Sequence, residues 1–411
     1  MSGLFPPLAE ESRSILDRLP RLIDETFPVP GRFRAAIPRN VAELSRLLTS
    51  ERKERNASYL GKPALLSAYL RYFLPWNIYR LCRLLSSLPL ELKPGGIVND
   101  LGAGPLTLAA ALWISRPDLR KLPLEFRCLD RTAAVLEAGK KFFAALSAAD
   151  ANRAGDCPWT INCIRGEIKA NGALFSGNRA FHAEIKERPA ALTAAANVYN
   201  ELFWNFSPVD SGALRRFTEG QARLLNSLTE SSGSILVLEP GIPRSGEFVS
   251  LLRSALMKHD RAPLSPCAHQ CACPFPGGLK AVPGAKAAKS RWCHFAFDTA
   301  DAPGELHRLS SAAGIPKERA VLSFLLAGPA SADKNKVSSR KVPSEAEKIR
   351  IISDSFSVGR DWGRYGCSGQ GLVLVCGSRR GMEGLPSGAL EALPLSGAAD
   401  EKSGALLARK D

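Results

Sequence analysis

The chain has 411 residues, which is enough to bury a large core and to form two or three structural units. Its 55 lysine and arginine residues outnumber its 40 aspartate and glutamate residues, and the formal net charge of +15 favours a polyanionic partner such as RNA or DNA. No run of about 18 apolar residues occurs, so the sequence predicts no membrane span.

The N-terminal residues predict neither an export signal nor a transit peptide. They include Glu10 and Glu11, and they lack the apolar core of a signal peptide. A bacterial-type cytoplasm is the expected compartment, and we expect a monomer. Ten cysteines in a chain without an export signal favour free thiols or metal ligands over disulfides.

Residues 1–95 are predicted to form a helical region. Apolar residues recur at three- and four-residue spacing over Ala42–Leu48 and Lys62–Leu88. Aromatic residues within the second range alternate with arginines, a pattern that can stack bases and bind phosphates. We expect instead that most of them pack this region against the next domain. They are Tyr69, Tyr72, Phe73, Trp76 and Tyr79.

From residue 96 onward, predicted strands and helices alternate, as a parallel sheet requires. The first strand ends in Asp100, a glycine pair follows at Gly102 and Gly104, and a helix begins near Pro105. Such a corner lets a ligand approach the backbone and presents unpaired N–H groups of the helix. Position 107 is threonine, so the third glycine of a dinucleotide fingerprint is absent.

A second acidic residue, Asp130, ends the next predicted strand at 124–130. A carboxylate at this position can accept the hydroxyls of a ribose, and it can also cap the helix predicted at 131–146. The acid-x-Gly-x-Gly corner followed by a strand with a terminal acid is similar to class I methyltransferases, which bind S-adenosylmethionine. The sequence therefore predicts an α/β fold with a Rossmann-like, seven-stranded sheet.

Later segments extend this sheet. Strands are predicted at 159–165, 190–199 and 233–239, and those at 320–326 and 371–376 are expected to complete the seven. We expect a surface loop at 331–348 and a poorly ordered tail at 378–411. Because ligands gather at the carboxyl ends of such strands, five polar residues there are candidate binding residues. They are Asp100, Asp130, Asn200, Glu201 and Glu239.

A cysteine-rich insertion at 263–300 interrupts this alternation. Cys267, Cys271 and Cys273 lie within seven residues of a proline- and glycine-rich loop, and Cys293 follows. Such crowding predicts thiolates around a metal. Spacing alone leaves zinc, with His269 or His294 as a further ligand, and an iron–sulfur cluster both open. The candidate for a ligand from elsewhere is Cys367, whereas the other five cysteines are expected in the core. Those five are Cys82, Cys128, Cys157, Cys163 and Cys376.

Six segments together resemble the methyltransferase-like assembly factors of the small ribosomal subunit, a family of mitochondria with bacterial members. The cysteine segment and the Trp-Cys-His-Phe motif are the most specific of them. The segments are 100–105, 200–202, 236–243, 266–274, 292–295 and 364–367.

The resemblance implies a [4Fe–4S] cluster held by Cys267, Cys273, Cys293 and Cys367, with the choice between Cys271 and Cys273 left open. It also implies S-adenosylmethionine binding and association with small-subunit rRNA in ribosome assembly or translation. In a eukaryotic member the compartment would be the mitochondrial matrix.

The resemblance and the residues together predict five regions. They are an N-terminal helical region at 1–95, a cofactor-binding domain at 96–262, the iron–sulfur insertion at 263–300, a segment completing the sheet at 301–377, and the tail at 378–411.

Three functional hypotheses follow. In the first, the chain is an S-adenosylmethionine-binding, iron–sulfur-containing, methyltransferase-like protein that acts on small-subunit rRNA in ribosome assembly or translation. If it transfers a methyl group, Gly102 and Gly104 hold the methionine end of the cofactor, Asp130 holds the ribose, and Asn200 and Glu201 border the methyl group. No catalytic base is assigned. The second is a non-catalytic rRNA-binding assembly factor with a vestigial pocket, and Leu106, where active relatives often have glycine, favours it. The third is a zinc-containing RNA methyltransferase. A radical enzyme is disfavoured, because its Cys-x3-Cys-x2-Cys motif is missing.

Overall fold

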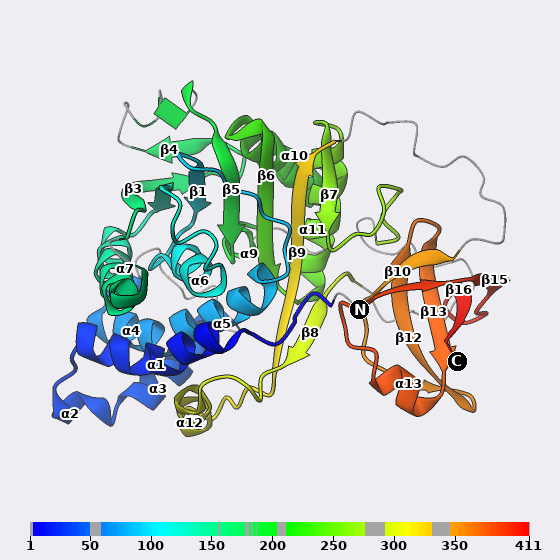
Figure 1. Cartoon of the computed structure of the whole chain (residues 1–411), viewed down its shortest axis with the longest axis horizontal. Coiled ribbons are helices and arrows are strands. Elements are labelled where there is room, and N and C mark those ends of the chain that lie inside the picture. The colour runs from blue at the N-terminus through cyan, green and yellow to red at the C-terminus, as the bar shows by residue number, and fades with distance from the viewer. Residues whose placement is uncertain are drawn as a thin grey trace.

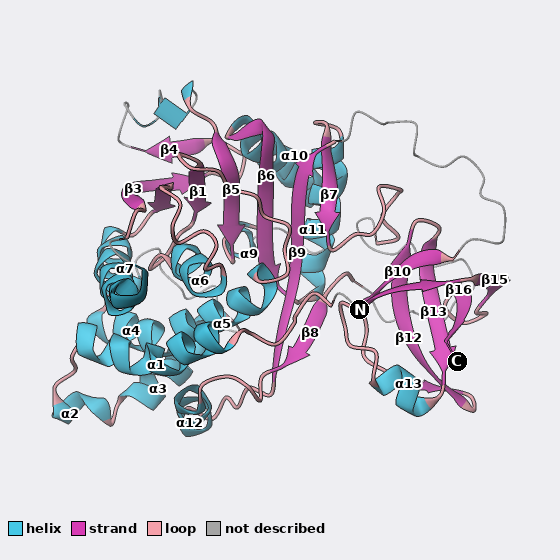
Figure 2. Ribbon diagram, viewed as in Figure 1, coloured by secondary structure: helices cyan, strands magenta, loops and turns pink. Residues whose placement is uncertain are grey.

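The structure is a computed structural model that describes residues 3–49, 59–154, 157–176, 181, 184–185, 187–203, 211–275, 292–330 and 346–410. Two units are visible, a large α/β unit and a smaller β-rich unit at the C-terminus (Figures 1 and 2). Most of the predicted surface loop at 331–348 and the lysine-rich part of the cysteine insertion lie outside the described residues. None of the helices in the described ranges is long and apolar enough to cross a membrane.

The large unit is built on one sheet with the strand order β4-β3-β2-β1-β5-β6-β9-β7, and β8 pairs with β9. Strands β1, β2, β3, β5 and β6 run parallel, whereas β9 is antiparallel to β6, β7 and β8. The bounds are β1 Ile97–Leu101, β2 Glu125–Asp130, β3 Thr160–Ile168, β4 Leu174–Ser176, β5 Ala190–Ala196, β6 Thr229–Pro240, β7 Arg261–Ser265, β8 Phe295–Asp298 and β9 Arg319–Pro329.

This topology is that of class I methyltransferases, as the sequence predicted. When β4 and β8 are left out and the other seven strands are numbered in chain order, they lie in the order 3-2-1-4-5-7-6 across the sheet. Only the seventh of them, β9, runs antiparallel to the others. Leu101 at the end of β1 pairs with Leu129 of β2 and Ala195 of β5. The carboxyl ends of three strands therefore meet at one edge, where such sheets bind ligands.

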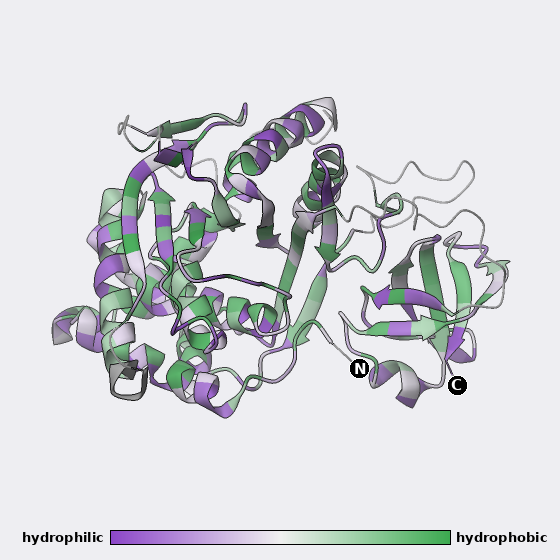
Figure 3. Ribbon diagram, turned by 45° about the horizontal axis from the view of Figure 1, so that its top comes forward, coloured by the Kyte–Doolittle hydropathy of each residue, from purple (hydrophilic) through white to green (hydrophobic). Residues whose placement is uncertain are grey.

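Helices cover both faces of this sheet (Figure 3), and most residues of its central strands β1, β5 and β6 are buried. Alternate strand residues face two separate cores. One core contains α6 and α7, and the other contains α10 and α11. These helices are α6 Thr107–Ser115, α7 Ala133–Ala154, α10 Ser211–Ser227 and α11 Pro243–Met257.

The N-terminal region is helical, as predicted, and packs on the core of α6 and α7. Tyr72, Trp76 and Tyr79 are buried, which confirms that these aromatics serve packing. The Trp76 indole N–H donates to Ser310 at the end of α12, 3.2 Å away. The elements are α1 Glu10–Thr26, α2 Gly31–Arg34, α3 Ile37–Leu48, η2 Tyr59–Gly61, α4 Pro63–Ala68, the π-helical η3 Tyr69–Phe73, α5 Leu74–Leu85 and, later in the chain, α12 Gly304–Ala312.

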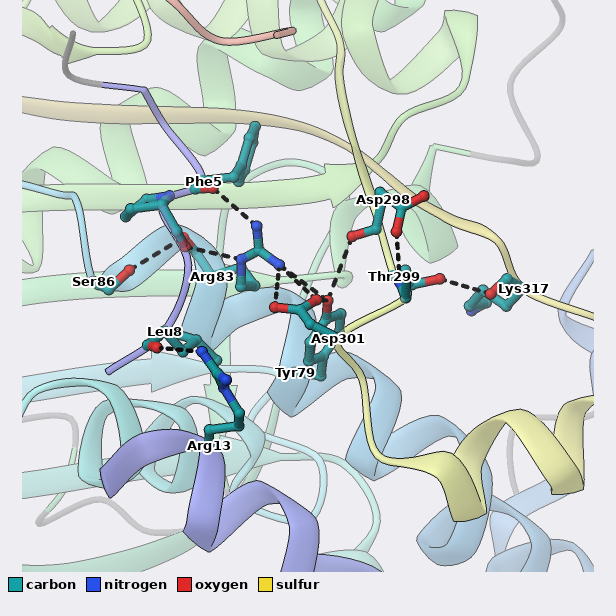
Figure 4. A network of polar contacts seen from close by, with 12 residues as sticks. Phe5, Leu8, Arg13, Tyr79, Arg83, Ser86, Asp298, Thr299, Asp301 and Lys317 are labelled. Carbon is teal, nitrogen blue, oxygen red and sulfur yellow. Dashed lines mark hydrogen bonds and ion pairs between the residues drawn. The ribbon is translucent and has the colours of Figure 1, made fainter. Parts of the chain in front are cut away.

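A buried arginine fixes the N-terminal segment to this unit (Figure 4). Arg83 on α5 donates to both carboxylate oxygens of Asp301 at 2.8 Å and to the backbone oxygens of Phe5 and Pro6 at 3.0 Å. Tyr79 also donates its hydroxyl to Asp301. One side chain thus joins the chain start, α5 and the loop before α12.

The C-terminal unit is a second sheet with the order β14-β10-β12-β13-β16-β15, with β11 on β12. All of its strand pairs are antiparallel except β13 with β16, which are parallel. When β11 is left out, three strands precede the short helix α13 and further strands follow it. The third strand, β13, is parallel to the last strand, β16, which is the connectivity of a partly open, OB-like barrel. The bounds are β10 Glu347–Ile351, β11 Phe356–Val358, β12 Asp361–Ser368, β13 Gly371–Gly377, α13 Arg379–Glu383, β14 Leu390–Leu393, β15 Leu395–Ala399 and β16 Leu406–Lys410.

Two sequence-based expectations are wrong here. The strand predicted at 371–376 is β13, which belongs to the barrel and does not complete the main sheet; β7 takes that place. The predicted tail at 378–411 contains α13 and β14–β16. These short segments are ordered because Leu385, Ala389 and Ala408 are buried against Ile349 and Val373 of the barrel core.

Candidate functional site

The glycine corner after β1 has the backbone of a ligand-binding loop. Gly102 and Gly104 have φ angles of +73° and +53°, and Leu106 has a φ of +57°. A side chain at Gly102 would begin 1.8 Å from a methyl carbon of Val198, so glycine also permits close packing of the loop after β5. Leu106 is fully buried in a conformation that costs a non-glycine residue about 1–2 kcal/mol.

The two predicted acids lie side by side at this corner. Asp130 accepts the backbone N–H of Gly104 at 3.0 Å and of Thr132 at 2.9 Å, so it ties β2 to the loop and caps the start of α7. Asp100 is buried, and its Oδ2 atom has no hydrogen-bond partner in the described structure. Burial and then the charge of Asp130 raise the pKa of Asp100 to about 7.

Asn200 and Glu201 lie on the short helix α9, Tyr199–Leu202, which follows β5. The backbone N–H groups of Tyr199 and Asn200 donate to Glu239 at 2.8 and 3.1 Å, so Glu239 anchors this turn. Burial raises the pKa of Glu239 to about 8. Glu201 forms an ion pair with Arg131 at 3.3 Å, across the mouth of the corner.

Side chains from the N-terminal helices fill the methionine end of this corner, which the sequence analysis did not predict. A cavity of only about 20 Å³ remains between Asp100, Gly104, Tyr69 and Asn77, close to the volume of one water molecule. The Tyr69 hydroxyl lies 4.0 Å from the point where a side chain at Gly104 would begin. Burial, followed by Glu201 and Asp130, raises the pKa of this hydroxyl, which Asn77 hydrogen-bonds.

Arg80 completes this closure. Its Nη2 atom donates to the side-chain oxygens of Asn197, at 2.7 Å, and of Asn77, at 3.1 Å. Asn197 directly follows β5 and has a φ of +60°. The arginine thus lies at the strand end where methyltransferase folds bring cofactor and acceptor together.

More space exists on the nucleoside side of Asp130. A cavity of about 100 Å³ lies between Gly102, Asp130 and Glu201, and an open cavity of about 510 Å³ follows along β3. The larger cavity is lined by Arg131, Arg165 and the exposed Phe175, among others. The larger cavity is open, whereas the space beside Gly104 is about that of one water molecule.

The raised pKa of Asp100 predicts a pH-dependent stability. Between its usual pKa near 4 and about 7, the folded state keeps a proton that the unfolded chain has released, so the free energy of unfolding falls as pH rises through this window. Asp100→Asn cannot ionise, and we expect it to lose less stability than the wild type between about pH 5 and about pH 8. Urea unfolding at both pH values checks this, and equal losses in the two proteins would contradict it.

The cysteine site lies where the two units meet. Cys267 and Cys273 follow β7, Cys293 precedes β8, and Cys367 lies on β12 of the barrel. Burial and then the charges of Cys267, Cys273 and Cys367 raise the pKa of Cys293, so the four cysteines lie in one region of the molecule and interact electrostatically.

The neighbouring candidates differ in position. Cys271 is exposed, with its sulfur near Gly369. The Nε2 atom of His269 lies 3.2 Å from the Cys367 sulfur, and burial, followed by Arg253, lowers the pKa of His269 to about 4, so its ring is neutral at pH 7. His294 stacks on Trp292 instead. Within the described ranges, no group of three or more His, Cys, Asp or Glu side chains is arranged to hold a metal ion.

Comparison with known proteins finds one matching family model and several similar solved structures. Residues 212–354 match the family described as mitochondrial small ribosomal subunit Rsm22. No curated protein sequence matches the chain.

Two of the similar solved structures illustrate the folds. A Listeria monocytogenes protein assigned to the class I S-adenosylmethionine-dependent methyltransferases is 11% identical, covers 81% of this chain and 90% of its own, and has a TM-score of 0.34. The precorrin-6y C5,15-methyltransferase of Geobacter metallireducens is 10% identical, covers 63% of this chain and 86% of its own, and has a TM-score of 0.28.

Proposed function

We propose that this chain belongs to the Rsm22 family, whose model matches residues 212–354, and that it is a binding factor of the small ribosomal subunit that contacts small-subunit rRNA. In this proposal the methyltransferase-like unit is a scaffold and transfers no methyl group. The net charge of +15 supports an RNA partner, because lysine and arginine side chains neutralise phosphates.

The closed glycine corner carries the non-catalytic part of the proposal. The acids Asp100 and Asp130 suit an S-adenosylmethionine molecule chemically, but the space does not. About 20 Å³ is free beside Gly104, which is about the volume of one water molecule. Tyr69 lines this space, and Arg80 donates to Asn77 and Asn197, which line it as well. The cofactor does not fit this arrangement, and we derive no transfer step.

A methyltransferase is the second candidate, and the unpartnered oxygen of Asp100 favours it. A buried carboxylate without a partner is costly, and the ammonium group of a methionine end would supply one. Movement of Tyr69 would be required to admit it. The nucleoside cavity beyond Asp130 already has the necessary room.

We also propose that Cys267, Cys273, Cys293 and Cys367 hold a metal centre, and that it is a [4Fe–4S] cluster with zinc as the alternative. The chemistry of the donor set supports this proposal, because four buried or half-buried thiols from three separate segments of the chain interact electrostatically, although these side chains, all within the described ranges, are not arranged around a metal ion in this structure. Such a cluster would supply a one-electron redox centre or a covalent link between segments. Here it would connect the barrel to the large unit.

Two measurements separate the functions. With purified small-subunit rRNA and tritiated S-adenosylmethionine, we expect tight binding that weakens steeply with salt, and no label in the RNA. Calorimetry should detect no cofactor binding to the wild type. Tyr69→Ala should show measurable cofactor binding, because it opens the corner.

Tyr69→Phe is the matched control, since it keeps the ring that fills the space and should not bind the cofactor. Label that appears in rRNA with the wild type and disappears with Asp100→Ala would establish the methyltransferase instead. A chain that binds neither rRNA nor small subunits would overturn the proposed function.

A further inference from the structure

Two arginines, one from each unit, hold the loop that carries Cys267 and Cys273; Arg253 is buried and Arg350 is half-buried. Arg253 lies on α11 of the large unit and is 3% exposed. Its Nη2 atom donates to the backbone oxygens of His269, at 3.0 Å, and Cys271, at 2.7 Å. Arg350 lies on β10 of the barrel and donates to the backbone oxygen of Pro266 at 2.8 Å. The loop is thus fixed from both sides.

The barrel presents Arg350 and Cys367 on one face. The two residues are directly opposite each other in the antiparallel pairing of β10 with β12. Residues opposite one another in such a pair point to the same side of the sheet. The side that faces the barrel core carries Ile349 and Ile351 instead. Arg350 and Cys367 therefore both point toward the large unit.

Both guanidinium groups also interact with the thiols. Burial raises the pKa of Cys267, Cys293 and Cys367, and the charge of Arg253 opposes this increase. Cys267 and Cys293 in turn interact electrostatically with Arg350. Neither arginine forms an ion pair with a carboxylate of the described chain, and the Nε atom of the buried Arg253 has no hydrogen-bond partner there. A buried cation without a counter-charge is unfavourable, so Arg253 above all needs a nearby negative group.

We infer that Arg253 and Arg350 are positioning residues of the metal centre, which hold its loop from both units and balance its charge. The inference rests on the proposed metal centre. Four thiolates around an oxidised [4Fe–4S] core leave a charge of about −2, which two guanidinium groups offset. Reduction makes the centre more negative, so nearby cations favour the reduced state and raise the reduction potential.

The test compares Arg253→Met and Arg350→Met with Arg253→Lys and Arg350→Lys after anaerobic purification. We expect the methionine variants to lose metal to a chelator at least about tenfold faster than the wild type. Their reduction potential should be more negative. The lysine variants should keep a potential near that of the wild type, because the charge remains, but should still lose metal faster, because lysine cannot donate two bonds to the loop in the same geometry.

Arg364→Met is the matched control. Arg364 is a buried arginine of the same barrel, but it donates to the backbone oxygens of Met382 and Ser353, away from the thiols. This variant should loosen the barrel without changing the potential, and circular dichroism verifies that every variant is folded.

The outcomes distinguish this inference from the proposed centre. A wild-type chain without bound metal overturns both. A wild type with metal, together with methionine variants that match it in potential and in the rate of metal loss, overturns the role of the arginines alone. If the wild type contains zinc in place of iron, the rate of metal loss alone tests the role of the arginines.

Discussion

Cys367→Ala is expected to abolish the metal content of the protein and to release the barrel from the large unit. Cys367 is the one predicted ligand that the barrel supplies, and it faces Cys267 and Cys273 across the junction. Anaerobically purified wild type should show a broad absorbance near ~400 nm and about four irons per chain. The variant should show neither. Amide hydrogen exchange should increase along β10 and β12, because their outer face loses its link.

Cys376→Ala is the control for this variant. Cys376 lies on the adjacent strand β13, is partly buried like Cys367, and is not among the predicted ligands. Its iron content and its exchange should match the wild type. A full complement of iron in Cys367→Ala would contradict the proposed ligand set. If the wild type contains one zinc per chain and shows no colour, the metal centre is a zinc site and not an iron–sulfur cluster.

The fold of the large unit could be predicted because its parallel strands are buried on both faces and appear as short apolar runs between helices. Ile97–Leu101 is such a run, and every residue in it is buried. The glycines and acids at the ends of these strands were predicted for the same reason, since the topology brings strand ends together. Their contacts with Tyr69 and Arg80 were not predicted. Tyr69 and Arg80 lie 35 and 24 positions before Gly104, in helical segments where nothing in the spacing separates a packing aromatic from one that fills a pocket.

The barrel could not be predicted from periodicity. Its strands are short, and β15 is mostly exposed, so few apolar residues mark them. The sequence of β13, Gly371–Gly377, is as apolar as a strand of the main sheet, and only the pairing with β12 and β16 assigns it to the barrel. The position of Arg253 in the sequence, by contrast, does indicate a buried charge. It interrupts an apolar helix face, and a charged residue in that position predicts a buried counter-charge nearby.

Arg83→Met should destabilise the large unit by about 3 kcal/mol, because it removes one partner of a largely buried ion pair and leaves two backbone oxygens without a donor. The Arg83 side chain is 10% exposed, and Asp301 is 35% exposed, so part of the lost pairing is recovered from water. Urea unfolding measures the change. Limited proteolysis should also cut the N-terminal segment sooner, because Phe5 and Pro6 lose their contact with α5.

Arg13→Met provides the comparison. Arg13 lies on α1 in the same region and donates to a single backbone oxygen, that of Leu8, at 3.3 Å (Figure 4). Its loss should cost less than about 1 kcal/mol. If both variants lost the same small amount of unfolding free energy, Arg83 would contribute no more than the single hydrogen bond of Arg13. A large and specific loss for Arg83→Met would show instead that the N-terminal segment is held by one residue. That residue lies on the same helix as Asn77 and Arg80, which help to close the glycine corner, so a loosened α5 should also open the corner to the cofactor.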